Sequence, residues 1–175
     1  VYRVVGYKFP VGSRTSKGLP AINFLEGIEK GENVVTLLPI DKYEEGTSIC
    51  LLTKKGIIKK TSIQEYVRIN SNGKRCITLD EGDELFDVML VKESDEILIG
   101  ANNGKLVRFD SVMFRNSGRA SMGVKAMKLS SKEHVIGLAN SAQGEMVLSI
   151  GANGIGKLTP VIEYRKTARN TKGVT

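Results

Sequence analysis

The chain has 175 residues, with 26 Lys and Arg against 19 Asp and Glu, so its formal net charge is +7 at pH 7. A composition of 41% hydrophobic and 26% charged residues is typical of a globular protein and argues against a largely disordered chain. Two cysteines, Cys50 and Cys76, and one histidine, His134, argue against a disulfide framework, a structural zinc site and Cys/His catalysis. They favour a reducing, cytoplasmic compartment. No apolar run approaches the length that spans a membrane.

Short alternating segments rich in Val, Ile, Leu and Thr predict strands along the whole chain. In chain order these segments are 48–53, 57–61, 76–79, 84–90, 95–101, 105–109 and 145–152. We expect short helical turns at 62–66 and 111–115, and no long amphipathic helix is visible. Turns are predicted at Asn72-Gly73, Asn103-Gly104 and Asn153-Gly154, because glycine accepts the positive φ of a tight turn.

The predicted strands belong to an internal repeat of about 50 residues. Two series of glycines recur in it: Gly56, Gly104 and Gly154, and Gly73, Gly123 and Gly173. About four strands per repeat predict one small antiparallel sheet for each copy, and radial stacking of such sheets gives a propeller. A linear stack of sheets is the alternative arrangement. We therefore expect an all-β, propeller-like array of four-stranded antiparallel blades, about three and a half of them. The approximate blade limits are 1–53, 54–102, 103–152 and an incomplete 153–175.

Charge follows the repeat. Four segments, one in each repeat, carry a net charge of +18 in total, and the rest of the chain carries −11. We call these segments the basic halves of the repeats: 1–18, 54–75, 104–125 and 154–173. If the repeats stack in one orientation, the basic halves form a continuous stripe. A stripe of this kind suits a polyanion longer than one repeat, bound through its phosphates with little sequence preference. No helix-turn-helix, zinc finger or aromatic RNA-binding signature is present. Cations that only keep the surface solvated are the alternative interpretation.

The basic residues that recur in these halves are the predicted phosphate contacts. They are Arg3, Arg14, Lys17, Lys59, Lys60, Arg68, Lys74, Arg108, Arg115, Arg119, Lys125, Lys157, Arg165, Arg169 and Lys172. Adjacent residues of a strand point to opposite faces, so Lys59 and Lys60 cannot share one face. The aromatic residues Tyr66, Phe114 and Tyr164 are interpreted as buried anchors of the repeat, with platforms for base stacking as the alternative. The repeated glycines are interpreted as turn formers, and a phosphate-binding role is compatible with that.

Four segments carry a family resemblance: VYRVVGYKFPVGSRTSKGLPAINFL, GIIKKTSIQEY, GKLVRFDSVMFRNSGRASMGVKAMKL and GIGKLTPVIEYRKTARNTKGV. In these segments the chain resembles the C-terminal domain of the bacterial DNA gyrase A protein. The resemblance implies a β-pinwheel of six blades, about half of them present here, with a strand exchanged between neighbours. It also implies that duplex DNA wraps around a basic outer rim and that this wrapping supports negative supercoiling. The C-terminal domain of topoisomerase IV is the alternative family, and a protein-binding scaffold is the alternative function.

The resemblance also implies which functions the segment lacks. The family's Q-R-R-G-G-K-G loop is absent, since 12–18 and 167–173 keep only its third-place Arg, its Lys and its final Gly. The catalytic Tyr of the family lies in the N-terminal part, so we expect no catalytic residue, cofactor or metal here. The parent protein would be an ATP-dependent type II topoisomerase of the bacterial cytoplasm, associated with the nucleoid. Its expected partners are double-stranded DNA, the rest of the gyrase A protein and the gyrase B subunit in a heterotetramer, without a membrane.

Overall fold

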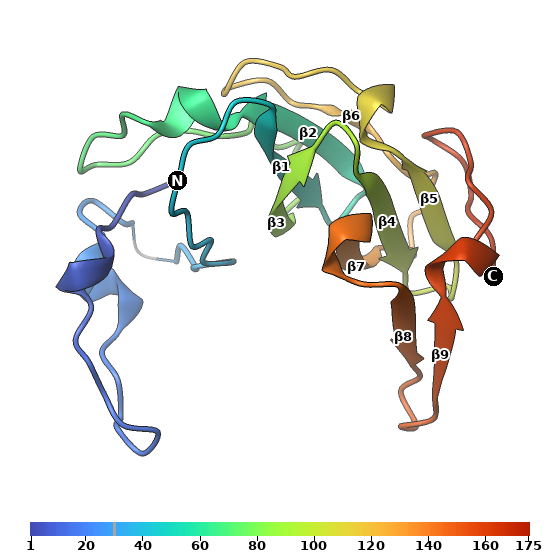
Figure 1. The fold of residues 1–175 in the computed structure, drawn as a ribbon, viewed down its shortest axis with the longest axis horizontal. Coiled ribbons are helices and arrows are strands. Elements are labelled where there is room, and N and C mark those ends of the chain that lie inside the picture. The colour runs from blue at the N-terminus through green and yellow to red at the C-terminus, as the bar shows by residue number, and fades with distance from the viewer. Residues whose placement is uncertain (30) are drawn as a thin grey trace.

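The computed structural model describes residues 1–29 and 31–175, which form an open arc of antiparallel β-sheets (Figure 1). The strands are β1 Thr47–Thr53, β2 Ile57–Ser62, β3 Leu85–Lys92, β4 Glu96–Ala101, β5 Leu106–Asp110, β6 Val124–Lys125, β7 Val135–Asn140, β8 Met146–Ile150 and β9 Gly156–Pro160. Short 3-10 turns connect them: η1 Gly6–Lys8, η2 Ala21–Phe24, η3 Ile63–Tyr66, η4 Ser111–Met113, η5 Ser141–Gln143 and η6 Val161–Glu163. The predicted all-β fold is confirmed. The part of the chain that the structure describes has no helix long and apolar enough to cross a membrane.

The strands form three sheets that follow one another along the arc. The first has the order β3-β1-β2-β6, the second β5-β4-β7 and the third β8-β9. β6 belongs to the repeat after β2 and pairs with the start of that strand, Ile57 and Ile58. In the second sheet, Val174 forms an antiparallel bridge to Leu106 of β5. Each of these two sheets therefore takes an outer strand or bridge from the following repeat.

The hairpins show where the expected blade limits lie relative to the sheets. The expected blade limits at 53/54, 102/103 and 152/153 fall in the turns of the β1–β2, β4–β5 and β8–β9 hairpins. Because hairpin strands pair with each other, each sheet joins strands from adjacent expected units.

Most predicted strands coincide with β1, β2, β3, β4, β5 and β8, and the predicted helical turns contain η3 and η4. The strand predicted at 76–79 is wrong. This segment contacts a loop instead of a strand: Thr78 N donates to the carbonyl of Ser121 at 3.2 Å, and the Thr78 side-chain Oγ1 donates to that of Ala120 at 2.6 Å. Ile77 is nevertheless buried, which accounts for the apolar alternation that suggested a strand.

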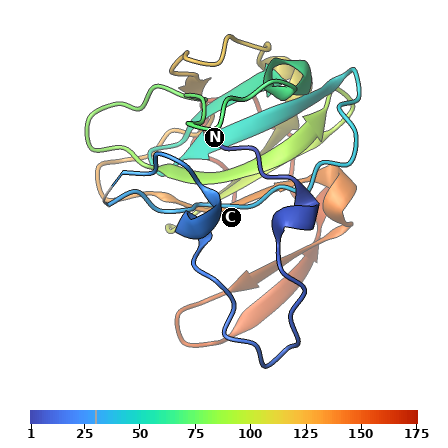
Figure 2. The ribbon, with the colours of Figure 1, turned by 90° about the vertical axis from the view of Figure 1, so that its left-hand side faces the viewer.

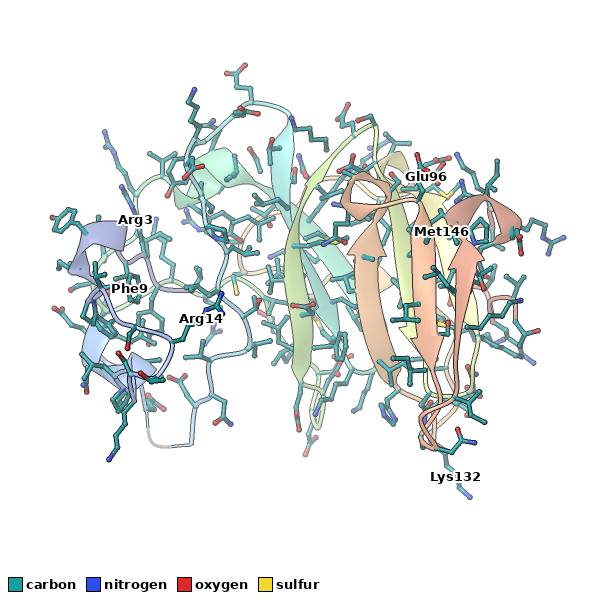
Figure 3. All side chains as sticks on the ribbon, turned by 60° about the horizontal axis from the view of Figure 1, so that its bottom comes forward. Arg3, Phe9, Arg14, Glu96, Lys132 and Met146 are labelled. Atoms are coloured by element: carbon teal, nitrogen blue, oxygen red, sulfur yellow. The ribbon has the colours of Figure 1, made fainter. Side chains whose placement is uncertain are left out.

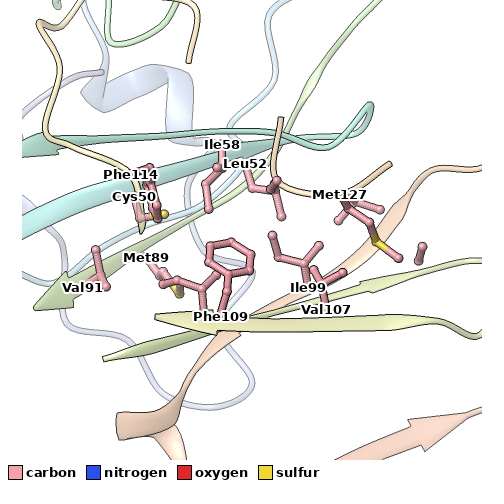
Figure 4. Close-up of a cluster of buried hydrophobic side chains, with 14 residues drawn as sticks. Cys50, Leu52, Ile58, Met89, Val91, Ile99, Val107, Phe109, Phe114 and Met127 are labelled. Carbon is pink, nitrogen blue, oxygen red and sulfur yellow. The ribbon is translucent and has the colours of Figure 1, made fainter. Parts of the chain in front are cut away.

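A hydrophobic cluster fills the space between the first and second sheets (Figure 4). Leu52 and Ile58 contribute from the first sheet, and Val107 and Phe109 from the second. Phe114 packs edge-on against Phe109, with ring centroids 6.2 Å apart and an interplanar angle of 72°. This edge-to-face arrangement is favourable beyond the burial of area alone.

A second cluster covers the opposite face of the first sheet. It contains Ile49, Leu51, Ile63 and Tyr66, and it packs against residues of the segment before β1. Tyr66 and Phe114 are therefore buried anchors, as predicted, whereas Tyr164 is only half-buried. Both faces of the first sheet are covered, so this sheet forms the centre of the described fold.

Cys50 lies fully buried in the cluster between the sheets, and burial raises the pKa of its thiol to about 12. In the unfolded chain this thiol releases its proton near pH 9. The contribution of the Cys50 thiol to folding stability is therefore complete below that pH and is lost as the pH rises toward 12. We expect a loss of about 1.4 kcal/mol from this thiol between pH 8 and pH 10. Urea unfolding at both pH values should show that the Cys50→Ala variant lacks this decrement. Equal pH slopes in the two proteins would contradict the assignment.

Residues 1–29 and 31–43 lie beside the first sheet, at the N-terminal end of the arc (Figure 2). Their described part contains η1 and η2 but no strand, and the rings of Phe9 and Phe24 pack at a tilt of 39° with centroids 4.9 Å apart. The N-terminal amine of Val1 donates to the Lys74 carbonyl at 2.7 Å, and Lys74 N donates back to the Val1 carbonyl at 2.9 Å. These paired hydrogen bonds tie the N-terminus to the segment after η3.

Candidate nucleic-acid interface

The convex side of the arc is formed by η3, η4 and η6 and by the segments that follow them (Figure 1). Each turn begins directly after a strand ends, at β2, β5 and β9 respectively. The Ser62 side chain accepts a hydrogen bond from Gln64 N and so caps η3. Since successive sheets repeat this connection, equivalent basic segments lie on the same side of the molecule. The hairpin turns β4–β5 and β8–β9 lie at the opposite ends of the strands.

Eight of the fifteen predicted phosphate contacts are exposed, and their side chains make no hydrogen bond or ion pair within residues 1–29 and 31–175. They are Arg14, Lys17, Arg68, Arg115, Lys125, Lys157, Arg165 and Lys172. Five of them belong to the segments after η3, η4 and η6, which run along the convex side (Figure 1). We call this set the rim cations: Arg68, Arg115, Lys125, Arg165 and Lys172. Arg68, Arg115 and Arg165 each lie two residues after a 3-10 turn, whereas Lys125 pairs with Ile57 at the start of β2 and Lys172 adjoins the bridge from Val174 to Leu106. The rim cations therefore extend along the whole length of these outer segments.

Arg14 and Lys17 lie elsewhere, on the exposed loop between η1 and η2. Figure 3 shows Arg14 with Arg3 and Phe9 at the N-terminal end of the molecule, far from Glu96 and Met146. Lys157 is on β9, where it pairs with Ser149 of β8. These three side chains are free to bind an anion but do not extend the convex surface.

Lys59 and Lys60 are buried, which removes both from the predicted interface. Lys59 is 1% exposed, and its Nζ donates to the carbonyl of Cys76 at 2.6 Å and to that of Arg119. Lys60 is 4% exposed, and its Nζ donates to the carbonyl of Ser111 at 2.8 Å. Burial lowers the pKa of both amines, because the charged form loses its hydration. The two side chains point to opposite faces of β2, as the alternation requires.

Arg108 is also held inside the protein. Its Nε lies 2.6 Å from Glu96 Oε2, and the two side chains are only 12% and 16% exposed. The hydrogen bond from Arg108 holds the pKa of Glu96 below its usual value. Lys166 joins the same group, with its Nζ 2.6 Å from Glu96 and 2.8 Å from Asp110. A guanidinium committed to this network is not available to a phosphate outside.

The remaining four predicted contacts bind backbone carbonyls within the protein. They are Arg3, Lys74, Arg119 and Arg169. Arg119 Nη1 donates to the Glu65 carbonyl at 3.0 Å and lies 3.2 Å from the Glu65 carboxylate. Arg169 Nη1 donates to the Lys125 carbonyl at 2.6 Å. These arginines support the loops that carry the rim cations.

The sequence reasoning missed Arg75, an exposed cation in the segment after η3. Arg75 stands two residues after Gly73, as Lys125 does after Gly123. The equivalent positions of Arg75 and Lys125 in successive repeats are therefore the signal that could have identified Arg75. In the described residues, no group of three or more His, Cys, Asp and Glu side chains is placed to hold a metal ion.

Comparison with known proteins gives consistent results for the whole chain. A sequence profile described as "DNA gyrase C-terminal domain, beta-propeller" matches residues 1–41, 47–92, 95–141 and 145–175. The DNA gyrase A protein of Ureaplasma parvum serovar 3 is 49% identical over 99% of this chain, and that of Mycoplasma genitalium is 45% identical over 99%. The matched regions are 20% and 21% of those two proteins, so the chain spans about one fifth of their length.

Two solved structures share the fold. The C-terminal domain of DNA topoisomerase IV has a TM-score of 0.81 at 24% identity, covering 90% of this chain and 49% of that one. The DNA gyrase A C-terminal domain has a TM-score of 0.80 at 19% identity, covering 91% of this chain and 53% of that one.

Proposed function

The chain belongs to the DNA gyrase C-terminal domain family, and on that premise we propose that it is a DNA-binding and DNA-wrapping module of a type IIA topoisomerase. The rim cations carry the proposal. They recur in three successive repeats, lie on one curved side, and make no internal ion pair within the described residues. Cations with these properties can neutralise successive phosphates of a duplex that follows the arc.

Binding of this kind is governed by phosphate neutralisation and the release of condensed counterions. It requires no reading of base edges, so affinity is expected to depend little on sequence. A curved row of cations also favours bent DNA, because bending brings more phosphates within reach of the protein. Wrapping around the convex side would thus let the parent enzyme control the handedness of a DNA crossing and support negative supercoiling.

We further propose that the segment contributes no catalytic group, cofactor or metal to that reaction. DNA cleavage and ATP use would belong to other parts of the parent assembly. That assembly would combine the rest of the gyrase A protein with the gyrase B subunit, in the bacterial cytoplasm at the nucleoid.

A gel-shift series between 50 and 200 mM salt, with two unrelated duplexes of equal length, tests the DNA-binding proposal. With about five phosphate contacts, the affinity for each duplex should fall by about 10² to 10³-fold over this range. The two duplexes should bind within about threefold of each other, since phosphates carry no sequence information. Absence of binding at 50 mM salt, or affinity that does not change with salt, would contradict the proposal and favour a protein-binding scaffold.

A further inference from the structure

A cation stands three residues before a 3-10 turn in three successive repeats. These cations are Arg3 before η1, Lys60 before η3 and Arg108 before η4. The register of the sheets makes the last two equivalent: Lys60 lies opposite Cys50 in β1, and Arg108 lies opposite Leu98 in β4.

Each of these cations donates to the 3-10 turn of the following repeat. Lys60 Nζ binds the carbonyl of Ser111, the first residue of η4, at 2.8 Å. Arg3 Nη1 binds the carbonyl of Val67, the residue after η3, at 2.7 Å. Arg108 Nη1 binds carbonyls at both ends of η6, each at 2.9 Å. The three contacts therefore join each repeat to the next in the same way.

The surroundings of Lys60 and Arg108 exclude an external anion. Lys60 is nearly inaccessible and lies 5.1 Å from the centroid of the Phe114 ring, which also belongs to the next repeat. Arg108 is paired with Glu96 in a largely buried contact. Fixed carbonyls replace the hydration of both cations, and a ring face adds to this at Lys60. Cations held in this way connect neighbouring sheets structurally.

The same position in the fourth repeat shows that the strand itself does not demand a charge. Leu158 precedes η6 by three residues and lies opposite Leu148 of β8. A leucine is therefore compatible with this place in the hairpin. The cations at the other three positions serve the contact with the next turn.

We propose that Arg3, Lys60 and Arg108 are positioning residues for DNA bending: they fix the angle between successive sheets and with it the curvature of the convex side. This inference rests on the proposed DNA-binding function. Bending a duplex costs free energy, and a surface that can pivot yields to the duplex instead of bending it. Loss of a connection should therefore reduce the bend of bound DNA while leaving the rim cations, and most of the affinity, in place.

The test compares Lys60→Met with Arg115→Met, a matched control that neutralises a rim cation. DNA affinity is measured over a salt series, and the bend is measured by energy transfer between dyes at the two ends of a bound duplex. We call the chain without substitutions the parent chain. For Lys60→Met we expect an affinity within about threefold of that of the parent chain, an unchanged salt slope and at least about a one-third loss of the bend-dependent energy transfer. For Arg115→Met we expect a slope smaller by about 0.9 and an unchanged bend.

The outcomes separate the inference from the proposed function. If the parent chain does not bind DNA, the proposed function fails. If the parent binds but Lys60→Met loses salt slope as Arg115→Met does, or bends DNA as the parent does, the inference is overturned.

Two further variants keep the test valid if Lys60→Met does not fold. Lys60→Arg restores the type of cation found at Arg3 and Arg108 and should bend DNA as the parent does. Arg3 lies outside both hydrophobic clusters, so the sheets of the Arg3→Met variant should still fold. The bend of bound DNA should decrease in this variant. An unchanged bend in Arg3→Met, or a bend lost in a folded Lys60→Arg, would also overturn the inference.

Discussion

Replacing Gly123 by valine should lower the free energy of unfolding by at least about 3 kcal/mol. Gly123 has a φ of +98°, a backbone conformation that a β-branched residue adopts only under strain. A Cβ atom there would lie 2.6 Å from the carbonyl oxygen of Ile58. That oxygen belongs to β2 and cannot move without opening the sheet, so the added methyl groups would force the exchanged strand β6 away from it.

A matched control is Gly118→Ala, five residues earlier in the same loop. A Cβ at Gly118 meets no atom within 4 Å, and its φ lies outside the left-handed region. Alanine there should leave stability unchanged or raise it by up to about 1 kcal/mol, because it restricts the unfolded chain. Urea titration followed by circular dichroism measures both variants. Similar midpoints for Gly123→Val and Gly118→Ala would show that the approach of β6 to β2 is not required.

The repeat period and the alternation of apolar residues were sufficient to predict the all-β fold, most strands and the anchors Tyr66 and Phe114. These features are local, since each strand shows its own period of two. The glycine series was also visible, but its role was only partly predicted. Gly123 and Gly173 do have positive φ, yet the close approach to Ile58 and Leu106 in other repeats accounts for the absence of a side chain. An approach between distant segments leaves no local signal.

The interface was harder to predict for the same reason. Lys59 and Lys60 look like any exposed basic pair in the sequence, and alternation predicts only that they face opposite ways. Both are buried because carbonyls from residues 17 to 60 positions away converge on their amines. Arg108 was likewise predicted as a phosphate contact, but Glu96 and η6 hold it inside. The predicted contacts that are exposed on the convex side all lie in segments where the chain leaves a sheet after a 3-10 turn.

A variant that neutralises three rim cations together should bind DNA much more weakly than the parent chain. The variant is Arg115→Gln, Lys125→Gln and Lys172→Gln, and none of these side chains makes a hydrogen bond or ion pair in the described part of the chain. Folding should therefore be little affected. If each cation neutralises one phosphate, removing three costs about 10² to 10³-fold in affinity at 0.1 M salt.

The matched control neutralises three exposed cations that lie outside the convex side and make no ion pair in the described part of the chain: Lys17→Gln, Lys132→Gln and Lys157→Gln. Lys17 lies on the loop between η1 and η2, Lys157 lies on β9, and Lys132 lies at an extreme tip of the molecule (Figure 3). This variant undergoes the same change in net charge. Its affinity should remain within a few-fold of the parent, because these positions do not face the DNA path.

The most direct test of the interface is the slope of log affinity against log salt for the parent and both triple variants. We expect the rim variant to have a slope smaller in magnitude by about 2.7, and the control variant to keep the parent slope. Equal slopes in the two triple variants would contradict the account, since the rim cations would then contribute no more phosphate contacts than cations elsewhere on the molecule.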